Sequence, residues 1–141
     1  MINTPTIINW NIRGLNANRN ELEVLCNEFQ PTFISLQETK TRTDITFKNY
    51  KVYSKIKDCN STNIASGGVM ILADKNIHTE LVDIDTTLQA IAIQTTYPMN
   101  FVFCNVYLDH GLRITEIQDK LDNLIRQLGH NFILTGDFNA H

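Results

Sequence analysis

The first 38 residues alternate between strand-like and helix-like segments, and this order constrains the fold more than any other feature. Residues 6–12 (TIINWNI) are β-branched and apolar, which is typical of a buried strand, and residues 32–38 (TFISLQE) have the same character. Between them, residues 19–31 predict a helix with Asn18 or Asn20 as N-cap and Pro31 at its end. Its apolar face would consist of Leu22, Leu25, Cys26 and Phe29. This order predicts a βαβ unit with adjacent parallel strands.

The middle of the chain differs, because short strands follow one another there without a helix. Five strand-like segments are separated by short polar breaks, at residues 50–56, 67–74, 78–84, 88–96 and 100–108. We expect them to form an antiparallel meander with Tyr97–Asn100 as a turn, and a bulge or hairpin feature at Gly67-Gly68.

Helical spacing returns in residues 111–130, where Gly129 occupies the position typical of a C-cap glycine. Residues 131–137 then read as a last strand. The order of elements predicts an α/β (α+β) fold.

The composition is that of one soluble domain, with 141 residues, 43% hydrophobic and 19% charged. The net charge of −3 shows no overall basic character. It does not exclude a nucleic-acid enzyme, because a bound metal can supply the positive field. The start of the chain lacks a signal-peptide pattern, and no apolar stretch approaches the roughly 20 residues of a membrane span. We therefore expect an intracellular protein, without a membrane partner, whose three cysteines are free thiols.

Five polar or amphipathic residues stand where an apolar strand ends, namely Asn11, Glu38, Tyr107, Asp137 and Asn139. In α/β sheets, sites form beyond the carboxyl ends of strands. Each residue alone has a simpler explanation: a turn for Asn11, a solvated loop for Glu38, a core position for Tyr107 and a helix cap for Asp137. Together, in the same strand-end position, they favour a single site.

The chemistry of that site would follow from its oxygen atoms. Carboxylates and amides that converge on one point suit a hard cation such as Mg²⁺. A second carboxylate nearby could orient a water for attack on phosphorus while the metal neutralises the phosphate. The predicted activity is phosphodiester cleavage.

Four segments, WNIRGL, LQETK, NVY and GDFNAH, occur in an order that resembles the endonuclease/exonuclease/phosphatase superfamily, with its DNase-I-like fold shared by exonuclease-III-type apurinic endonucleases. The resemblance extends from Thr6 to the last residue. Within the superfamily, GDFNAH and SGGVMIL are most similar to the N-terminal endonuclease of non-LTR retrotransposons. The resemblance implies a four-layer α/β sandwich of two packed mixed β-sheets flanked by helices. Each half of the domain would supply most of one sheet, so residues 1–141 alone would leave a flat apolar face uncovered.

The resemblance also implies roles for the five residues. Glu38 would bind Mg²⁺ or Mn²⁺ with help from Asn11, and Asp137 would orient or activate the attacking water. Tyr107 and Asn139 would contact the phosphate or hold the water and the transition state. His141 does not match the family's catalytic histidine, and we expect a secondary role for it.

Three departures from the family pattern shape the expectations. Arg13 stands where many repair endonucleases have an acid, which argues against a second metal contact there. Leu108-Asp109 replaces a proline usual after the motif tyrosine. The family's later catalytic aspartate and its Ser-Asp-His motif are absent from the sequence. We therefore expect residues 1–141 to be a partial domain truncated after the Asp-x-Asn strand, lacking its C-terminal half, with a reverse transcriptase domain downstream.

The predicted function is that of a DNA endonuclease, acting in the nucleus, that nicks target DNA to prime reverse transcription, with the fragment inactive alone. Three alternatives remain open at this point. They are an apurinic-site repair endonuclease, a phosphatase for small phosphoesters, and a non-catalytic remnant of a mobile element.

Overall fold

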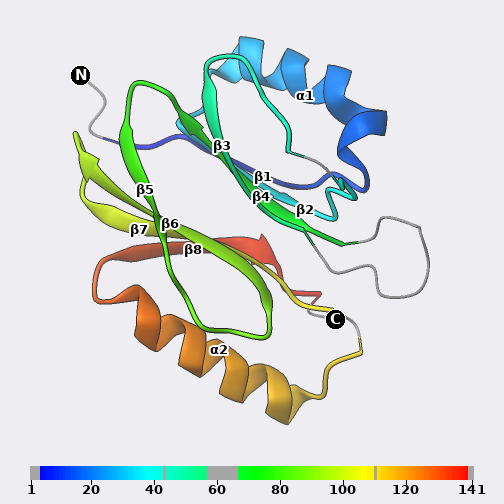
Figure 1. Cartoon of the computed structure of the whole chain (residues 1–141), viewed down its shortest axis with the longest axis vertical. Coiled ribbons are helices and arrows are strands. Elements are labelled where there is room, and N and C mark those ends of the chain that lie inside the picture. Colours follow the sequence, from blue (N-terminus) through cyan, green and yellow to red (C-terminus); the bar gives the residue numbers. More distant parts are fainter. Residues whose placement is uncertain (1–3, 43, 57–66, 110, 140–141) are drawn as a thin grey trace.

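The computed structural model describes residues 4–42, 44–56, 67–109 and 111–139. Within these residues the chain forms two four-stranded sheets and two helices (Figure 1). The strands are β1 (Ile7–Asn11), β2 (Phe33–Gln37), β3 (Tyr50–Lys55), β4 (Val69–Asp74), β5 (His78–Val82), β6 (Gln89–Tyr97), β7 (Phe101–Tyr107) and β8 (Phe132–Asp137), and the helices are α1 (Leu15–Phe29) and α2 (Ile114–Leu128).

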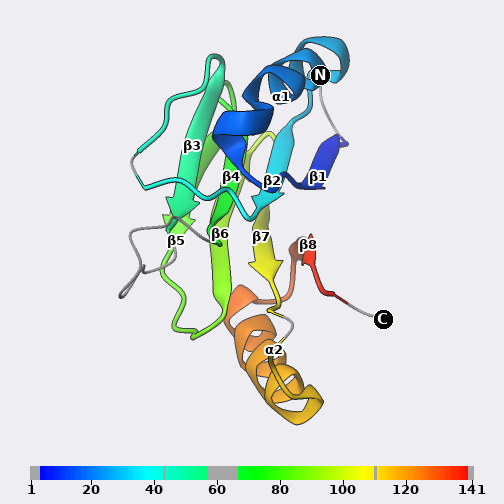
Figure 2. The same ribbon diagram turned by 90° about the vertical axis from the view of Figure 1, so that its right-hand side faces the viewer.

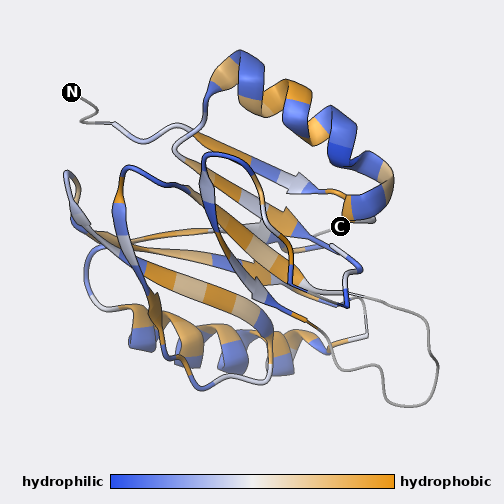
Figure 3. Ribbon diagram, turned by 45° about the horizontal axis from the view of Figure 1, so that its top comes forward, coloured by the Kyte–Doolittle hydropathy of each residue, from blue (hydrophilic) through white to orange (hydrophobic). Residues whose placement is uncertain are grey.

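The elements stack as four layers, which confirms the predicted sandwich. The first sheet has the order β1-β2-β4-β3 and the second has the order β5-β6-β7-β8. Helix α1 covers the outer face of the first sheet and α2 the outer face of the second (Figures 1 and 2). Figure 3 shows that the central strands are the most hydrophobic part of the molecule, as burial on both faces requires.

The predicted βαβ unit is present, because β1 pairs in parallel with β2 from Ile7↔Phe33 to Asn11↔Gln37. The predicted start of its helix is wrong. Helix α1 begins at Leu15, which is buried, and neither proposed asparagine caps it. The Asn18 side chain instead donates to the carbonyl of Ile12 (2.7 Å), and its backbone leaves the helical region at φ −117°. An asparagine that bonds preceding carbonyls competes with helical geometry in this way.

The apolar face of α1 is only partly as predicted. Leu22 and Cys26 are buried against the first sheet, whereas Phe29 is 59% exposed. The helix ends at Phe29, and Gln30 adopts a left-handed conformation (φ 44°). The proline that follows Gln30 disfavours a helical conformation there, as expected.

The middle strands divide between the two sheets, which corrects the single meander. Strands β3 and β4 pair with each other and extend the first sheet beside β2. Only β5, β6 and β7 form an antiparallel meander, in the second sheet, with residues 97–100 as its predicted turn. Helix α2 connects β7 to β8, and β8 pairs in parallel with β7. The C-cap of α2 is Gly129, as expected.

The Gly67-Gly68 pair directly precedes β4, which forms an antiparallel hairpin with β3 as one of the two expectations had it, and the pair also contacts the loop after β2. The Gly67 carbonyl accepts from the Lys40 amide (2.8 Å) and the Gly68 carbonyl from the Thr39 amide (3.3 Å). Both glycines have positive φ, at 62° and 96°. The turn expected at residues 57–66 lies outside the described residues.

The expectation that this chain supplies most of one sheet, with a bare flat face, is wrong. After β4 the chain crosses into the second sheet, and apolar side chains of both sheets cover each other. Phe33 of the first sheet stacks on Phe103 of the second at 4.9 Å between ring centroids and meets Phe101 edge-on at 5.7 Å. This packing buries the inner faces of both sheets.

The open parts of the structure are strand edges. Within the described residues, β1 pairs only with β2 and β8 pairs only with β7. The two edge strands lie side by side (Figure 2), and the Asn9 amide donates to the Gly136 carbonyl at 3.0 Å. Their apolar residues are only half-buried, namely Ile7, Ile8, Trp10, Phe132, Ile133 and Leu134.

Two of the three cysteines are described, and both are free thiols as expected. Burial raises the pKa of Cys26 to about 11 and that of Cys104 to about 12, which keeps both protonated at neutral pH. In the described part of the chain, neither helix is long and apolar enough to cross a membrane.

Gly136 is the position where the close approach of β7 and β8 leaves no room for a side chain. A Cβ there would lie 1.8 Å from the Val106 carbonyl oxygen, and its φ of 149° disfavours other residues. We expect Gly136→Ala to lower the free energy of unfolding by at least about 3 kcal/mol in a thermal melt. Gly111→Ala is the matched control, because nothing lies within 4 Å of its Cβ position. Equal melting temperatures for the two variants would contradict the expectation.

Candidate active site

The carboxyl ends of four strands, two from each sheet, meet at one end of the sandwich. In the first sheet the last pair is Asn11↔Gln37, and Glu38 follows β2 directly. In the second sheet the last pair is Tyr107↔Asp137, and Asn139 follows two residues later. The structure therefore brings the five predicted residues to one place, which we call the active-site cluster.

The side chain of Asn11 joins the two sheets. Its Nδ2 donates one hydrogen bond to Glu38 Oε2 in the first sheet and another, of 2.8 Å, to Asp137 Oδ2 in the second. Its Oδ1 accepts from the Arg13 amide at 3.3 Å, which fixes the orientation of the amide. One neutral amide thus holds two carboxylates from different sheets within reach of the same nitrogen.

Asn139 and Tyr107 complete the cluster on the second sheet. The Asn139 backbone amide donates to Asp137 Oδ1 at 3.1 Å, and its side-chain amide donates to the Leu108 carbonyl. Tyr107 is 7% exposed. Burial, followed by the Glu38 carboxylate, raises the pKa of Tyr107 above its ordinary value, although a hydrogen bond with Asn139 opposes this. The phenol is therefore protonated at neutral pH and able to donate.

The Leu108-Asp109 segment, which replaces the family's proline, has a defined conformation. The Leu108 amide donates to the Asp137 carbonyl at 2.9 Å, and the Leu108 carbonyl accepts from Asn139. Asp109 Oδ2 accepts from the side chain of Gln89 at 3.3 Å. Backbone pairing with the end of β8 thus holds this loop in place of a proline.

The backbone is strained around the active-site cluster. Among the described non-glycine residues, left-handed φ values of 46° to 53° occur at Arg13, Glu38, Lys40 and Asn139. Elsewhere, positive φ occurs only at Gln30, which caps a helix, and at Asn49, which precedes β3. Such conformations cost of order 1–3 kcal/mol each and gather at functional sites. Their concentration here supports a functional role for this end of the sandwich.

A second set of polar residues, not predicted from the sequence, lies beneath the cluster. Asn9, Asn105 and Thr135 each lie two residues before a member of the cluster on the same strand, and Gln37 lies directly before Glu38. Ser35, Gln37 and Asn105 are fully buried between the sheets. The detectable signal was a polar residue, two positions before each strand end, on the face that otherwise reads as core.

The donor set of the cluster fits a divalent cation of the Mg²⁺ type. Glu38 and Asp137 face each other across a neutral amide, and no described Lys, Arg or His lies within 4 Å of either carboxylate. The described residues contain no group of three or more His, Cys, Asp or Glu placed to hold a metal. Mg²⁺ needs no such cage, because it binds through one or two carboxylates and keeps several waters. The site suits an open, water-rich magnesium centre.

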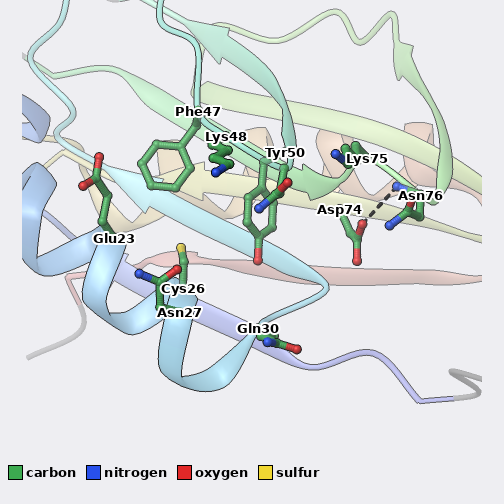
Figure 4. Close-up of a pocket in the computed structure, with 11 residues that line it drawn as sticks. Glu23, Cys26, Asn27, Gln30, Phe47, Lys48, Tyr50, Asp74, Lys75 and Asn76 are labelled. Atoms are coloured by element: carbon green, nitrogen blue, oxygen red, sulfur yellow. Dashed lines mark hydrogen bonds between the residues drawn. The ribbon is translucent and has the colours of Figure 1, made fainter.

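A polar cavity of about 490 Å³ lies elsewhere, between α1, the start of β3 and the turn after β4 (Figure 4). It contains Cys26, Tyr50 and Asp74 among its lining residues. Asp74 follows the β4 residue that pairs with Phe33 at the start of β2, whereas Glu38 follows the end of β2. The cavity is therefore a strand length away from the active-site cluster and contains none of its members.

Solved structures share this fold. The endonuclease domain of TRAS1, a telomere-specific non-LTR retrotransposon, superposes with a TM-score of 0.74 at 15% identity, over 98% of this chain and 60% of that one. The 3'-5' exonuclease NExo of Neisseria meningitidis gives 0.63 at 22% identity over 95% and 57%, and an AP endonuclease of Archaeoglobus fulgidus gives 0.62 at 19% over 97% and 58%. The chain thus spans about 60% of the length of these relatives.

A search among curated proteins finds no match. The endonuclease/exonuclease/phosphatase family, whose members are hydrolytic nucleases and phosphatases, matches residues 8–141. That range includes the whole active-site cluster and nearly all of the sandwich, and the chain belongs to this family.

Proposed function

We propose that this chain is the first part of a divalent-metal-dependent endonuclease, encoded by a non-LTR retrotransposon, that nicks DNA. The observation that carries the proposal is the bridge from Asn11 to Glu38 and Asp137, which joins two carboxylates across the two sheets. The TM-score for the TRAS1 endonuclease domain, 0.74, is higher than the 0.63 for the exonuclease NExo and the 0.62 for the AP endonuclease, which supports the retrotransposon origin.

The proposed roles follow from the hydrogen bonds. Glu38, with the amide of Asn11 beside it, would hold Mg²⁺ or Mn²⁺, which when bound neutralises charge on the scissile phosphate. Asp137 accepts one hydrogen bond on each carboxylate oxygen, so each oxygen keeps a lone pair that can orient a water. Tyr107 is protonated and would donate to a phosphate oxygen, next to Asn139.

We also propose that the complete domain has a second half, which pairs with the open edges of β1 and β8. The length of the relatives supports this, because each is covered for only 57% to 60%. The half-buried apolar residues of both edges support it as well, since long open edges are otherwise prone to associate. That half would carry the family's Ser-Asp-His motif, and a reverse transcriptase domain would follow it. We propose that the complete protein acts in the nucleus, where it would nick target DNA.

A second candidate is an apurinic-site endonuclease or a phosphatase of the same family. The AP endonuclease of Archaeoglobus fulgidus has the same fold. The 3' phosphatase NExo from Neisseria has been solved with a product DNA hairpin, which supports DNA as the substrate class. Comparing intact DNA with abasic DNA separates the candidates, because a repair enzyme cleaves only at the abasic site. A protein that cleaves neither DNA is a phosphatase if it hydrolyses small phosphoesters, and a non-catalytic remnant if it does not.

The metal and water roles predict which substitutions abolish activity in the complete protein. Glu38→Ala and Asp137→Ala should each reduce plasmid nicking in Mg²⁺ by a factor of about 10³ or more, because several kcal/mol of barrier is lost. His141→Ala should do much less, which makes it the matched control. Retention of a third of wild-type nicking by either acidic variant would refute its assigned role.

The bridge predicts an effect that needs no substrate. Asn11→Asp replaces the shared donor by a third negative charge, so we expect a loss of about 1–3 kcal/mol of stability at pH 7. The loss should shrink towards about pH 4, where carboxyl groups protonate, and millimolar Mg²⁺ should reverse it at pH 7. Asn27→Asp, on the surface of α1, is the control for added charge. If the stability loss of Asn11→Asp changed neither with pH nor with added Mg²⁺, the cation site would be contradicted.

The open edges predict how residues 1–141 behave alone. We expect this chain to self-associate in sedimentation experiments, and a form extended by the second half to be monomeric. Leu81→Lys places a charge on β5, the opposite edge of the second sheet, where Leu81 is 61% exposed. It should leave the association unchanged. A strictly monomeric 1–141 chain would contradict the role of the edges.

A further inference from the structure

Beneath the active-site cluster, the space between the sheets contains polar side chains. On β7 the order along the inward face is Phe103, Asn105 and Tyr107, and on β8 it is Ile133, Thr135 and Asp137. On both strands an apolar residue, a polar residue and a cluster residue follow one another at two-residue spacing, which keeps them on one face. We call the middle set the polar layer, consisting of Asn9, Ser35, Gln37, Asn105 and Thr135.

Asn105 is the centre of the polar layer, and its bonds all cross from the second sheet to the first. It is fully buried. Its Nδ2 donates to the carbonyls of Leu36 (2.8 Å) and Met70 (2.9 Å), and its Oδ1 accepts from Gln37 Nε2 at 2.8 Å. One side chain thus uses both donors and its acceptor to connect β7 with β2 and β4.

Two further bonds fix β8 against the first sheet. Thr135 Oγ1 lies 2.8 Å from Ser35 Oγ on β2, and Asn9 Nδ2 donates to the Gly136 carbonyl at 3.0 Å. On β8 these bonds involve Thr135 and Gly136, the two residues directly before Asp137. The polar layer therefore holds the strands that carry Asn11, Tyr107 and Asp137.

Gln37 indicates that the polar layer has a purpose besides stability. Its Nε2 donates to Asn9 Oδ1 (2.9 Å) and to Asn105 Oδ1. Its own Oε1 is buried without a hydrogen-bond partner among the described residues. Exchanging the positions of Oε1 and Nε2 would not give Oε1 a donor from these two residues. Asn9 and Asn105 donate through Nδ2 to backbone carbonyls, so both present an acceptor oxygen to Gln37. A buried acceptor without a partner costs free energy that a leucine here would not cost.

We propose that Asn105 and Gln37 are positioning residues that fix the offset between the two sheets, so that Asp137 stays within hydrogen-bond distance of Asn11. Apolar contacts tolerate small sliding of one sheet over the other, whereas hydrogen bonds require defined distances and angles. The cluster is shared between the sheets, so a shift of about 1 Å would separate its members. The catalytic part of this inference rests on the proposed nuclease function.

The decisive variant is the pair Asn105→Leu/Gln37→Leu in the complete protein. Removing both side chains leaves neither partner of the Gln37–Asn105 bond stranded, so the variant should fold, as judged by a cooperative thermal transition. We expect kcat for plasmid nicking to fall about 10- to 100-fold, with little change in KM. Phe103→Leu, one step further from the site on the same strand, is the control and should lower the melting temperature without changing kcat.

A second readout works without substrate. In the wild type, the Asn11 side-chain amide protons are bonded to carboxylates of both sheets, and their NMR resonances and slow exchange report that state. The double variant should move them towards those of a free amide. A stable double variant with wild-type kcat and an unchanged Asn11 signal would overturn the inference.

The two proposals fail in distinguishable ways. If the complete wild-type protein nicks no DNA, the nuclease function falls, and the Asn11 resonances still decide the positioning role. If the double variant does not fold, Thr135→Val is the substitute, because it removes the bond to Ser35 with almost no change in shape. It should lower kcat several-fold and shift the same Asn11 signals, and the absence of both effects would overturn the inference.

Discussion

The active-site cluster depends on the face-to-face packing of two sheets, because its two carboxylates belong to different sheets. Glu38 follows β2 and Asp137 ends β8, and the Asn11 amide between them donates to both carboxylates. The stacking of Phe33 on Phe103 lies further along the same strands and is an apolar contact between the two sheets. A hydrophobic contact in the core and a polar bridge at the strand ends thus both join the inner faces of the two sheets. The apolar contact brings the sheets together, whereas the hydrogen bonds near the strand ends require a defined offset between them.

The sequence was informative about the site because each cluster residue interrupts an apolar pattern. A carboxylate or amide directly after a buried strand is conspicuous, and four such places shared one end of the sheets once the strands were parallel. The sequence was less informative about which strands pair. Strands β3 to β7 all read as short strand-like segments, and the pattern of a strand does not state which sheet it joins. After β4 the chain crosses from the first sheet to the second, and this crossing is determined by long-range packing around Ile71, Phe33 and Phe103.

The start of α1 was missed for a different reason. The segment before Arg19 is rich in asparagine, which usually marks a cap, yet the helix begins at Leu15 because that side chain is buried against the first sheet. Tertiary burial outweighed local preference there. Likewise, Asn9, Asn105 and Gln37 were not recognised, because a single polar residue in a strand reads as its solvent side. Only the sheet partner shows that Asn105 faces the interior.

The proposed second half of the domain would affect the rigidity of the site. Strands β1 and β8 each carry a member of the bridge, Asn11 and Asp137, and each is also an open edge. Edge strands have one unpaired side and open locally at lower free energy than central strands. In contrast, Glu38 follows a central strand, and its loop is tied to Gly67 and Gly68 by two backbone bonds. The Glu38 carboxylate therefore follows a central strand whose loop is fixed by backbone bonds, whereas Asp137 and Asn11 lie on edge strands that would gain further rigidity from a neighbouring strand.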